Sequence, residues 1–327
     1  MDLQGKKPVI PKRLISIVVP VYNEQDVLRV FHERLSPVLS KLGVPVEVIY
    51  VNDGSSDATL EVLRSLRAAD ERVAILDLSR NFGKEIALTA GLDHASGDAV
   101  IVIDADLQDP PELILEFLQH WREGYDVVYA QRTEREGESA LKKATAHVFY
   151  RVIQRASHVK IPEDAGDFRL LSRRAVDSLR QLREQHRFMK GLFAWIGYPQ
   201  KAVSYQREAR AAGKTKWNYW RLWNFALEGI TSFTTAPLKF ATYIGLFTAL
   251  ASFIYAAVVI YKTLAFGEPV RGYPSLMVVI LFLGGVQLFT IGIIGEYLGR
   301  MFNEAKQRPL YIVKDYLPAG APPKNSP

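Results

Sequence analysis

The chain of 327 residues contains no cysteine. This absence excludes a disulfide-stapled scaffold, a thiolate metal site and a cysteine nucleophile. A glycine-rich G-x-G-x-x-G segment is also missing after the first apolar run, residues 14–19. A Rossmann-type dehydrogenase is therefore disfavoured, because that segment forms the dinucleotide-binding turn.

Charge is scarce in one part of the chain. Lys+Arg number 41 and Asp+Glu 35, yet only five of these residues fall within 236–299. Residues 240–261 and 272–295 carry no charge, and each stretch exceeds the roughly 20 residues that cross a hydrocarbon core of about 30 Å. The linker between them is short and contains Gly267 and Pro269. We predict a transmembrane helical hairpin; the alternative is a pair of buried core helices.

The distribution of basic residues predicts which side of the membrane the body occupies. The loop between the spans has two basic residues, whereas the tail after the second span has Arg300, Lys306, Arg308 and Lys314, and the body is more basic still. The positive-inside rule then places the body and both termini in the cytoplasm. No apolar run of signal-peptide length follows the basic N-terminal residues.

The body alternates apolar, β-branched-rich runs with stretches of helical character. The runs are residues 14–19, 46–51, 73–78, 99–103 and 126–130. This alternation predicts an α/β fold with a doubly wound, mostly parallel sheet. Ligands bind such sheets at the carboxyl ends of the strands. Four polar segments follow the first four runs, so we expect them on one rim: residues 20–24, 52–57, 79–84 and 104–111.

Asp104 and Asp106 follow the fourth run. Side chains two residues apart on a strand face the same way, and two carboxylates there require a cation between them. Mg²⁺ or Mn²⁺ bridging a diphosphate meets that requirement. The structural alternative is a turn, where Asp is common.

Asp53 also has two interpretations. The Asp53-Gly54 pair is a turn signal, with Asp57 as a helix N-cap before Ala58. The functional interpretation puts the Asp53 carboxylate at the nucleobase or ribose of a nucleotide, where it accepts hydrogen bonds.

These segments together resemble the inverting glycosyltransferases of family 2, which have the GT-A fold. Residues 20–24, residues 52–55 and the Asp104–Asp106 pair match that family in order and spacing. Further segments look like the polyisoprenyl-phosphate sugar transferases, and most of all the prophage-type bactoprenol (undecaprenyl-phosphate) glucosyltransferases. They are residues 80–84, 104–111, 166–169 and 210–216, with the hairpin, and the resemblance extends from about residue 14 to 313.

The resemblance implies metal-dependent, inverting transfer of a hexose to a polyprenyl phosphate at the cytoplasmic face of a bacterial inner membrane. By resemblance the donor is UDP-glucose, while GDP-mannose and UDP-linked amino sugars stay open, and the cofactor is Mg²⁺ or Mn²⁺. The expected partners are the nucleotide sugar, the lipid phosphate and the membrane, with no nucleic acid. A lone two-helix hairpin is also compatible with a homo-oligomer.

The resemblance also assigns residues. For the nucleotide sugar they are Pro20, Tyr22, Glu24, Asp53, Lys84, Asp104, Ala105, Asp106 and Gln108, with Asp104 and Asp106 as metal ligands and Asp106 and Asp167 as catalytic residues. For the acceptor phosphate they are Arg169, Arg210 and Lys216.

Two of these assignments keep alternatives. Asp167 occupies the position of the base, but the second pKa of a phosphate monoester is about 6, so little proton removal is needed at neutral pH. Asp167 then orients the acceptor or a cation. An exposed local ion pair between Asp167 and Arg169, worth about 0 to 1 kcal/mol, is the structural alternative.

Two segments have interfacial character. Trp217, Trp220 and Trp223 recur near helical spacing and predict an interfacial helix over 217–235. A second amphipathic helix is expected over 140–157, with ordinary packing as an equal alternative. The predicted organisation is a catalytic domain over 1–216, the interfacial helix, the hairpin over 236–299 and a cytoplasmic tail over 300–327.

Two rival functions belong to other classes. A processive polysaccharide synthase carries a Gln-x-x-Arg-Trp motif at the acceptor end; this chain has none, and two spans make a thin channel. A noncatalytic membrane scaffold or nucleotide sensor is disfavoured because Asp104, Asp106, Asp167, Arg169 and Lys216 are all retained.

Overall fold

The computed structural model describes residues 14–132, 162, 165–206, 236–266 and 272–320. One sheet of eight strands in the order β7-β5-β6-β4-β1-β2-β3-β8 forms the centre of the body. The strands are β1 (Ile15–Val21), β2 (Val46–Asn52), β3 (Val73–Leu78), β4 (Ala99–Val102), β5 (Val127–Arg132), β6 (Ala165–Ser172), β7 (Gln200–Tyr205) and β8 (Val313–Leu317).

The centre of the sheet is parallel. β1 pairs in parallel with β2 and β4, and β2 pairs in parallel with β3. β6 runs antiparallel between β4 and β5, and β8 runs antiparallel along β3. The predicted doubly wound, mostly parallel α/β fold is confirmed. The antiparallel β6 was not predicted, and its direction brings the start of β6 to the carboxyl end of β4.

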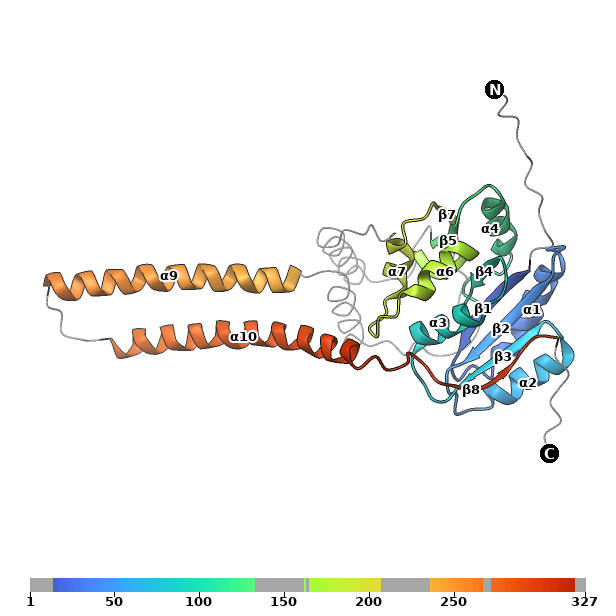
Figure 1. Cartoon of the computed structure of the whole chain (residues 1–327), viewed down its shortest axis with the longest axis horizontal. Coiled ribbons are helices and arrows are strands. Elements are labelled where there is room, and N and C mark those ends of the chain that lie inside the picture. Colours follow the sequence, from blue (N-terminus) through green and yellow to red (C-terminus); the bar gives the residue numbers. More distant parts are fainter. Residues whose placement is uncertain (1–13, 133–161, 163–164, 207–235, 267–271, 321–327) are drawn as a thin grey trace, which may run out of the picture.

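Helices cover both faces of the sheet (Figure 1). On one face lie α1 (Leu28–Ser40), α2 (Thr59–Ala69) and α4 (Leu113–Arg122), and on the other α3 (Lys84–His94), α6 (Arg173–Gln181) and α7 (Met189–Trp195). Strand side chains alternate between the two cores, as Ile17 and Val18 show. Each face is therefore apolar, and polar groups gather at the strand ends.

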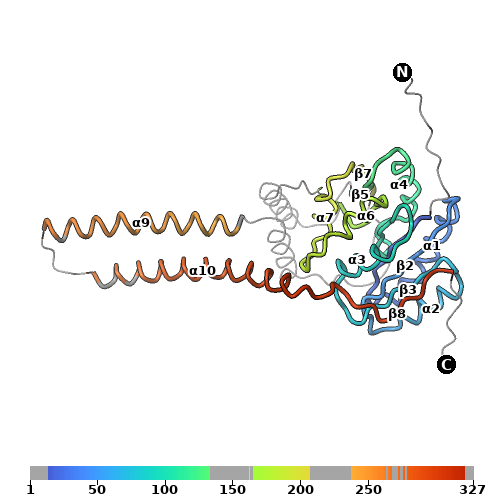
Figure 2. Tube along the Cα trace, in the orientation of Figure 1, coloured from blue at the N-terminus to red at the C-terminus, as the bar shows by residue number. Residues whose placement is uncertain are grey.

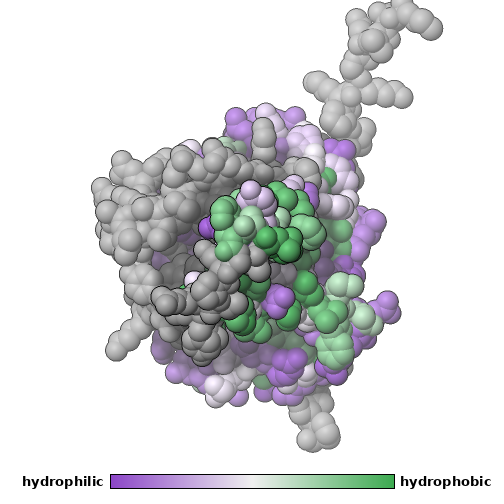
Figure 3. Space-filling view, turned by 90° about the vertical axis from the view of Figure 1, so that its left-hand side faces the viewer, coloured by the Kyte–Doolittle hydropathy of each residue, from purple (hydrophilic) through white to green (hydrophobic). Residues whose placement is uncertain are grey.

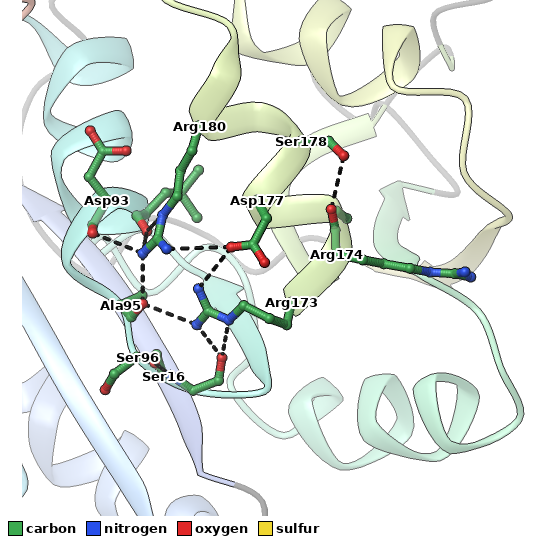
Figure 4. A network of polar contacts seen from close by, with 12 residues as sticks. Ser16, Asp93, Ala95, Ser96, Arg173, Arg174, Asp177, Ser178 and Arg180 are labelled. Carbon is green, nitrogen blue, oxygen red and sulfur yellow. Dashed lines mark hydrogen bonds and ion pairs between the residues drawn. The ribbon is translucent and has the colours of Figure 1, made fainter.

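Arginines of α6 hold the end of α3 (Figure 4). The Arg180 guanidinium donates to the carbonyls of Leu92 and Ala95, each at 2.8 Å, and Arg173 Nε donates to the Gly97 carbonyl at 2.8 Å. The last carbonyls of a helix have no partner within the helix, and cations there also complement its dipole. These contacts fix α3, whose first residue, Lys84, lies at the opposite end.

The hairpin consists of α9 (Ala236–Phe266) and α10 (Tyr273–Ala305), which lie side by side away from the body (Figures 1 and 2). Their apolar segments have a mean hydropathy of 2.1 and 2.3, and only 6% and 0% of the most apolar windows are buried. The alternative of buried core helices is therefore wrong, and the hairpin presents a hydrophobic surface beside the hydrophilic body (Figure 3).

Both helices outrun the predicted spans, 240–261 and 272–295. Lys262 alone does not end α9, because one charge near a helix end leaves the backbone hydrogen bonds intact. Past Gly295, α10 continues until Gln307 takes a positive φ of 48°, a conformation common just beyond a helix end.

The segment after α10 is more than a tail, because it returns to the body as β8 (Figure 2). Tyr316 aligns with Leu76 of β3, and Tyr311, Val313 and Tyr316 pack against the core on the α3 face. Covering the β3 edge in this way removes an unpaired strand edge. It also ties the hairpin to the body.

Truncation after Arg308 is expected to lower the free energy of unfolding of the body by about 3 kcal/mol. Three partly buried side chains and one strand pairing are lost, and a fully buried apolar side chain contributes about 1.5 to 3 kcal/mol. Denaturant unfolding of the detergent-solubilised protein measures the change. Truncation after Gly320, which leaves β8 whole, is the matched control. Equal stability of the two truncated proteins would contradict a stabilising role for β8.

Candidate active site

Hydrogen bonds link the loops that follow β1 and β2. Asn23, at a φ of 54°, accepts through Oδ1 from the Ser56 backbone N–H at 2.8 Å, and its own N–H donates to Ser55 Oγ at 3.0 Å. The Glu24 N–H donates to Thr59 Oγ1 at 2.9 Å. Two other residues near these loops were predicted to bind the nucleotide sugar. Pro20 lies within β1, and Tyr22 is 41% exposed.

Asp53 links the β2 loop to the β3 loop. Its carboxylate accepts hydrogen bonds from the backbone N–H groups of Phe82 at 2.7 Å and Gly83 at 2.9 Å. Gly54, with φ 64°, lets the two loops approach, because a Cβ there would lie 2.3 Å from the Arg80 carbonyl carbon. In this structure Asp53 thus shapes the loop before α3, and nucleotide contact by Asp53 stays a prediction.

Asp104 and Asp106 lie in a turn beyond β4, which ends at Val102. The expectation that strand alternation aligns them was therefore wrong in its reason; the turn, with Leu107 at φ 58°, sets their positions. Ala105 between them is buried, and Asp106 Oδ1 accepts from the Gln108 N–H at 3.1 Å.

The residues of this turn suit a divalent cation that a substrate helps to bind. Mg²⁺ is usually held by one or two carboxylates together with phosphate oxygens. Within the described residues no three or more His, Cys, Asp or Glu side chains form a metal cluster. The donor set of Asp104 and Asp106 fits a cation whose remaining ligands come from a diphosphate and water.

Lys84 joins the β4 turn to β6. Its Nζ lies 2.7 Å from Asp104 Oδ2 and 2.5 Å from Asp167 Oδ2. Asp167 reaches this point because β6 is antiparallel to β4, with Arg169 aligned with Val102. The predicted convergence of polar strand ends is thus present as a connected set of contacts from the β1 loop to β6.

Arg169 is engaged within the protein. Its side chain is buried, the guanidinium lies 3.8 Å from the Phe193 ring centroid, and it donates to the Gly166 carbonyl at 2.6 Å. Among the described residues Asp167 forms its ion pair with Lys84, so the alternative of an exposed Asp167–Arg169 pair does not describe this site. Phosphate binding by Arg169 stays a prediction.

The charges at this centre are strongly coupled. Burial raises the pKa of Asp167, but the ammonium of Lys84, and after it that of Lys190, outweighs burial and holds this pKa well below its ordinary value. Partial burial also opposes the charge on Lys84, yet Asp104 and Asp167 raise the pKa of Lys84 well above its usual range. Asp167 is therefore a carboxylate, and Lys84 an ammonium, throughout the neutral range.

Sequence reasoning missed Glu85 and Lys190. Glu85 Oε2 accepts from the Met189 N–H at 3.1 Å, and burial raises the pKa of Glu85 to about 7, with Asp167 adding to the shift. Lys190 on α7 faces the same centre, and burial lowers its pKa. Glu85 could have been suspected from its place beside Lys84, whereas no motif marks Lys190.

A second polar contact that sequence reasoning missed supports the turn after Asp106. The Tyr205 hydroxyl donates to buried Asp109, and Arg132 Nε donates to the Tyr205 hydroxyl at 3.3 Å. The ends of β5 and β7 thereby hold the far side of the turn.

Several predicted features lie outside the described residues. They are Arg210 and Lys216 and the two predicted interfacial helices, 140–157 and 217–235.

Two family models match the chain. Residues 16–180 match glycosyl transferase family 2, and residues 236–301 match the GtrB C-terminal hairpin. Asp53, Lys84, Asp104, Asp106 and Asp167 all fall within the first match.

The chain is also similar to curated proteins over nearly its whole length. An uncharacterized glycosyltransferase of Synechocystis sp. is 56% identical, over 93% of this chain and 97% of that protein. The bactoprenol glucosyl transferase of Shigella phage SfV is 52% identical, over 92% of this chain and 98% of its own.

Among solved structures, one similar chain is glucosyl-3-phosphoglycerate synthase of Mycobacterium tuberculosis in complex with Mn²⁺, UDP-glucose and phosphoglyceric acid. It is 20% identical, with a TM-score of 0.44, over 67% of this chain and 78% of its own.

Proposed function

Since the chain belongs to glycosyl transferase family 2, and is thus a glycosyltransferase, we propose that it transfers glucose from UDP-glucose to undecaprenyl phosphate. The proposed place is the cytoplasmic face of a bacterial inner membrane. One observation carries the proposal: Lys84, Asp104 and Asp167 meet on one rim of a body that β8 ties to an apolar hairpin. Relatives named bactoprenol glucosyl transferase support the lipid acceptor.

The proposed reaction is a single displacement with inversion. An oxygen of the acceptor phosphate forms a bond to the anomeric carbon, and the bond from that carbon to the nucleoside diphosphate breaks. Asp104 and Asp106 would hold Mg²⁺ or Mn²⁺, which supplies positive charge at the departing diphosphate. No proton must be removed from a dianionic acceptor. Asp167 orients the attacking group and keeps Lys84 at the reaction centre.

The hairpin supports a membrane location for this reaction. α9 and α10 are each long and apolar enough to cross a membrane, and the second family model covers them. The interfacial helices, the cytoplasmic placement of both termini and the domain limits 1–216, 217–235, 236–299 and 300–327 belong to the same proposal. A homo-oligomer stays a prediction.

A transfer assay with a panel of donors tests the proposal. The solubilised protein is incubated with undecaprenyl phosphate and, in turn, UDP-glucose, UDP-linked amino sugars and GDP-mannose. Singly glucosylated lipid from UDP-glucose alone is expected. Preference for another donor would overturn the assignment of glucose, a polymer would favour the processive synthase, and binding without turnover would favour the scaffold.

Reporters fused before Leu14 and after Pro327 are both expected on the cytoplasmic side. β8 pairs with β3 in the sheet of the body, so the segment after α10 cannot lie across a membrane from the body. The location of each terminus is measured with two kinds of reporter, one active only in the cytoplasm and one active only in the periplasm. A periplasmic signal from the C-terminal fusion would contradict the two-span topology.

Arg210→Ala and Lys216→Ala are each expected to lower turnover on the order of 10²-fold. Donor diphosphate and acceptor phosphate bring several negative charges together, and fixed cations that stabilise developing charge contribute effects of that size. The measurement is initial rate in detergent at saturating lipid. Lys142→Ala, on the predicted helix over 140–157, is the control and should keep its rate. Wild-type rates for both loop variants would mean that the acceptor phosphate binds elsewhere.

A further inference from the structure

The Lys84 ammonium forms an ion pair with Asp104, a carboxylate that the proposed divalent cation needs as a ligand. It lies 2.7 Å from Asp104 Oδ2 and 2.5 Å from Asp167 Oδ2, so one cation bridges two elements of the rim. A divalent cation at the Asp104 carboxylate would lie within a few ångströms of this ammonium. Two cations so close repel each other, by an amount that depends on how much water screens them.

Lys84 is free to move without disturbing the fold. It is the first residue of α3, its side chain is 44% exposed, and its ammonium ends a flexible four-carbon stem. The helix itself is held at its far end by Arg180. A displacement of the ammonium by a few ångströms therefore breaks the ion pair with Asp104 but needs only side-chain rotation and leaves the backbone in place.

Asp167 has spare capacity to receive the displaced ammonium. Its Oδ1 is buried and has no hydrogen-bond partner among the described contacts, while Oδ2 already binds Lys84. A buried carboxylate oxygen without a partner is costly, and an ammonium has three donors. If Lys84 leaves Asp104, it can pair with both oxygens of Asp167.

We propose that Lys84 competes with the divalent cation for Asp104, so that the metal alone binds weakly and binds well only together with the donor diphosphate. The inference rests on the proposed function and adds to it that metal binding depends on the nucleotide sugar. A diphosphate brings negative charge that offsets the repulsion between the two cations and offers Lys84 a new partner. Metal and nucleotide sugar then bind cooperatively, and Lys84 is a positioning residue that remains at the centre when both are bound.

Titration of the full-length, detergent-solubilised protein with Mn²⁺, followed by electron paramagnetic resonance of free Mn²⁺, tests this without any turnover. Lys84→Met is expected to tighten binding of Mn²⁺ alone on the order of tenfold, because one positive charge near a divalent cation is removed. Lys84→Arg keeps the charge and should bind Mn²⁺ like the wild type. Lys41→Met, an exposed lysine beyond α1, should also bind like the wild type.

Saturating UDP provides the second measurement. UDP should tighten Mn²⁺ binding to the wild type much more than to Lys84→Met. The variant already binds Mn²⁺ more tightly in the absence of UDP, because the competing ammonium has been removed. Equal Mn²⁺ affinity of Lys84→Met and the wild type without UDP would overturn the inference, while sugar transfer by the wild type would leave the proposed function intact. If Asp106→Asn binds Mn²⁺ as tightly as the wild type, the proposed metal site itself fails.

Discussion

Asp106→Asn is expected to lower sugar transfer roughly 10³-fold while the protein stays folded. The substitution keeps the size of the side chain but removes the negative charge that a divalent cation requires. Loss of preorganised charge stabilisation at a developing anion costs about 10² to 10³ in turnover, and here the whole cation is affected. Initial rates with saturating UDP-glucose and lipid measure the effect, and thermal unfolding checks the fold.

The structure supports an isosteric exchange at this position. Asp106 lies in a turn that is also held by a side-chain contact on its far side, the hydrogen bond from the Tyr205 hydroxyl to the Asp109 carboxylate. Its Oδ1 accepts from the Gln108 N–H, and the Asn side-chain carbonyl can accept there too. Asp26→Asn, an exposed carboxylate beyond the β1 loop, is the matched control and should keep full activity. Full activity of the wild type in excess EDTA would contradict the metal assignment.

The periodicity of the sequence predicted most of the fold because buried parallel strands are continuous apolar runs. The predicted run 73–78 coincides with β3, and the predicted runs for β1, β2 and β4 differ from the strands by one or two residues at their ends. Direction was not readable in the same way. β6 is as buried as a parallel strand, and only its pairing with Val102 and its neighbours reveals that it is antiparallel.

β8 could not be predicted for a different reason. Its five residues include Lys314 and Asp315, and a short, partly polar edge strand looks like a solvated tail. This segment becomes a strand because it pairs with the open edge of β3 and because Tyr311 and Tyr316 pack on an apolar surface. Both the edge and the surface exist only after the sheet has formed.

The residues of the candidate site could be predicted from the sequence where they belong to a motif that directly follows a strand. Lys84, Asp104 and Asp106 were expected on one rim, and Asp167 was assigned to the site only by resemblance. Lys84 forms ion pairs with both Asp104 and Asp167. Lys190 could not be found, because it joins the centre only through the packing of α7 against the sheet. The burial of Arg169 likewise depends on Phe193, a residue of that same helix.

Asp167→Asn is expected to lower turnover roughly 10³-fold, yet to leave the acidic limb of the pH–rate profile where it is. The carboxylate holds Lys84 and orients the acceptor, and loss of such preorganised charge costs about 10² to 10³. The position of the limb reports something else. A base whose pKa lies far below its ordinary value, as Lys84 makes that of Asp167, does not titrate between pH 5 and 8.

The group that titrates in this window is, on this argument, the acceptor. Its second pKa is about 6, so the dianion is lost, and the rate falls, as the pH drops through that value. Glu85 is the competing candidate, because burial raises its pKa to about 7.

The measurement is kcat/KM for the lipid from pH 5 to 8, in the wild type, Asp167→Asn and Glu85→Gln. An unmoved limb in both variants, and a limb that shifts upward with a lipid phosphonate of higher second pKa, is the expected result. A limb that disappears in Asp167→Asn would mean that Asp167 acts as the catalytic base, and one that disappears in Glu85→Gln would assign the proton to Glu85.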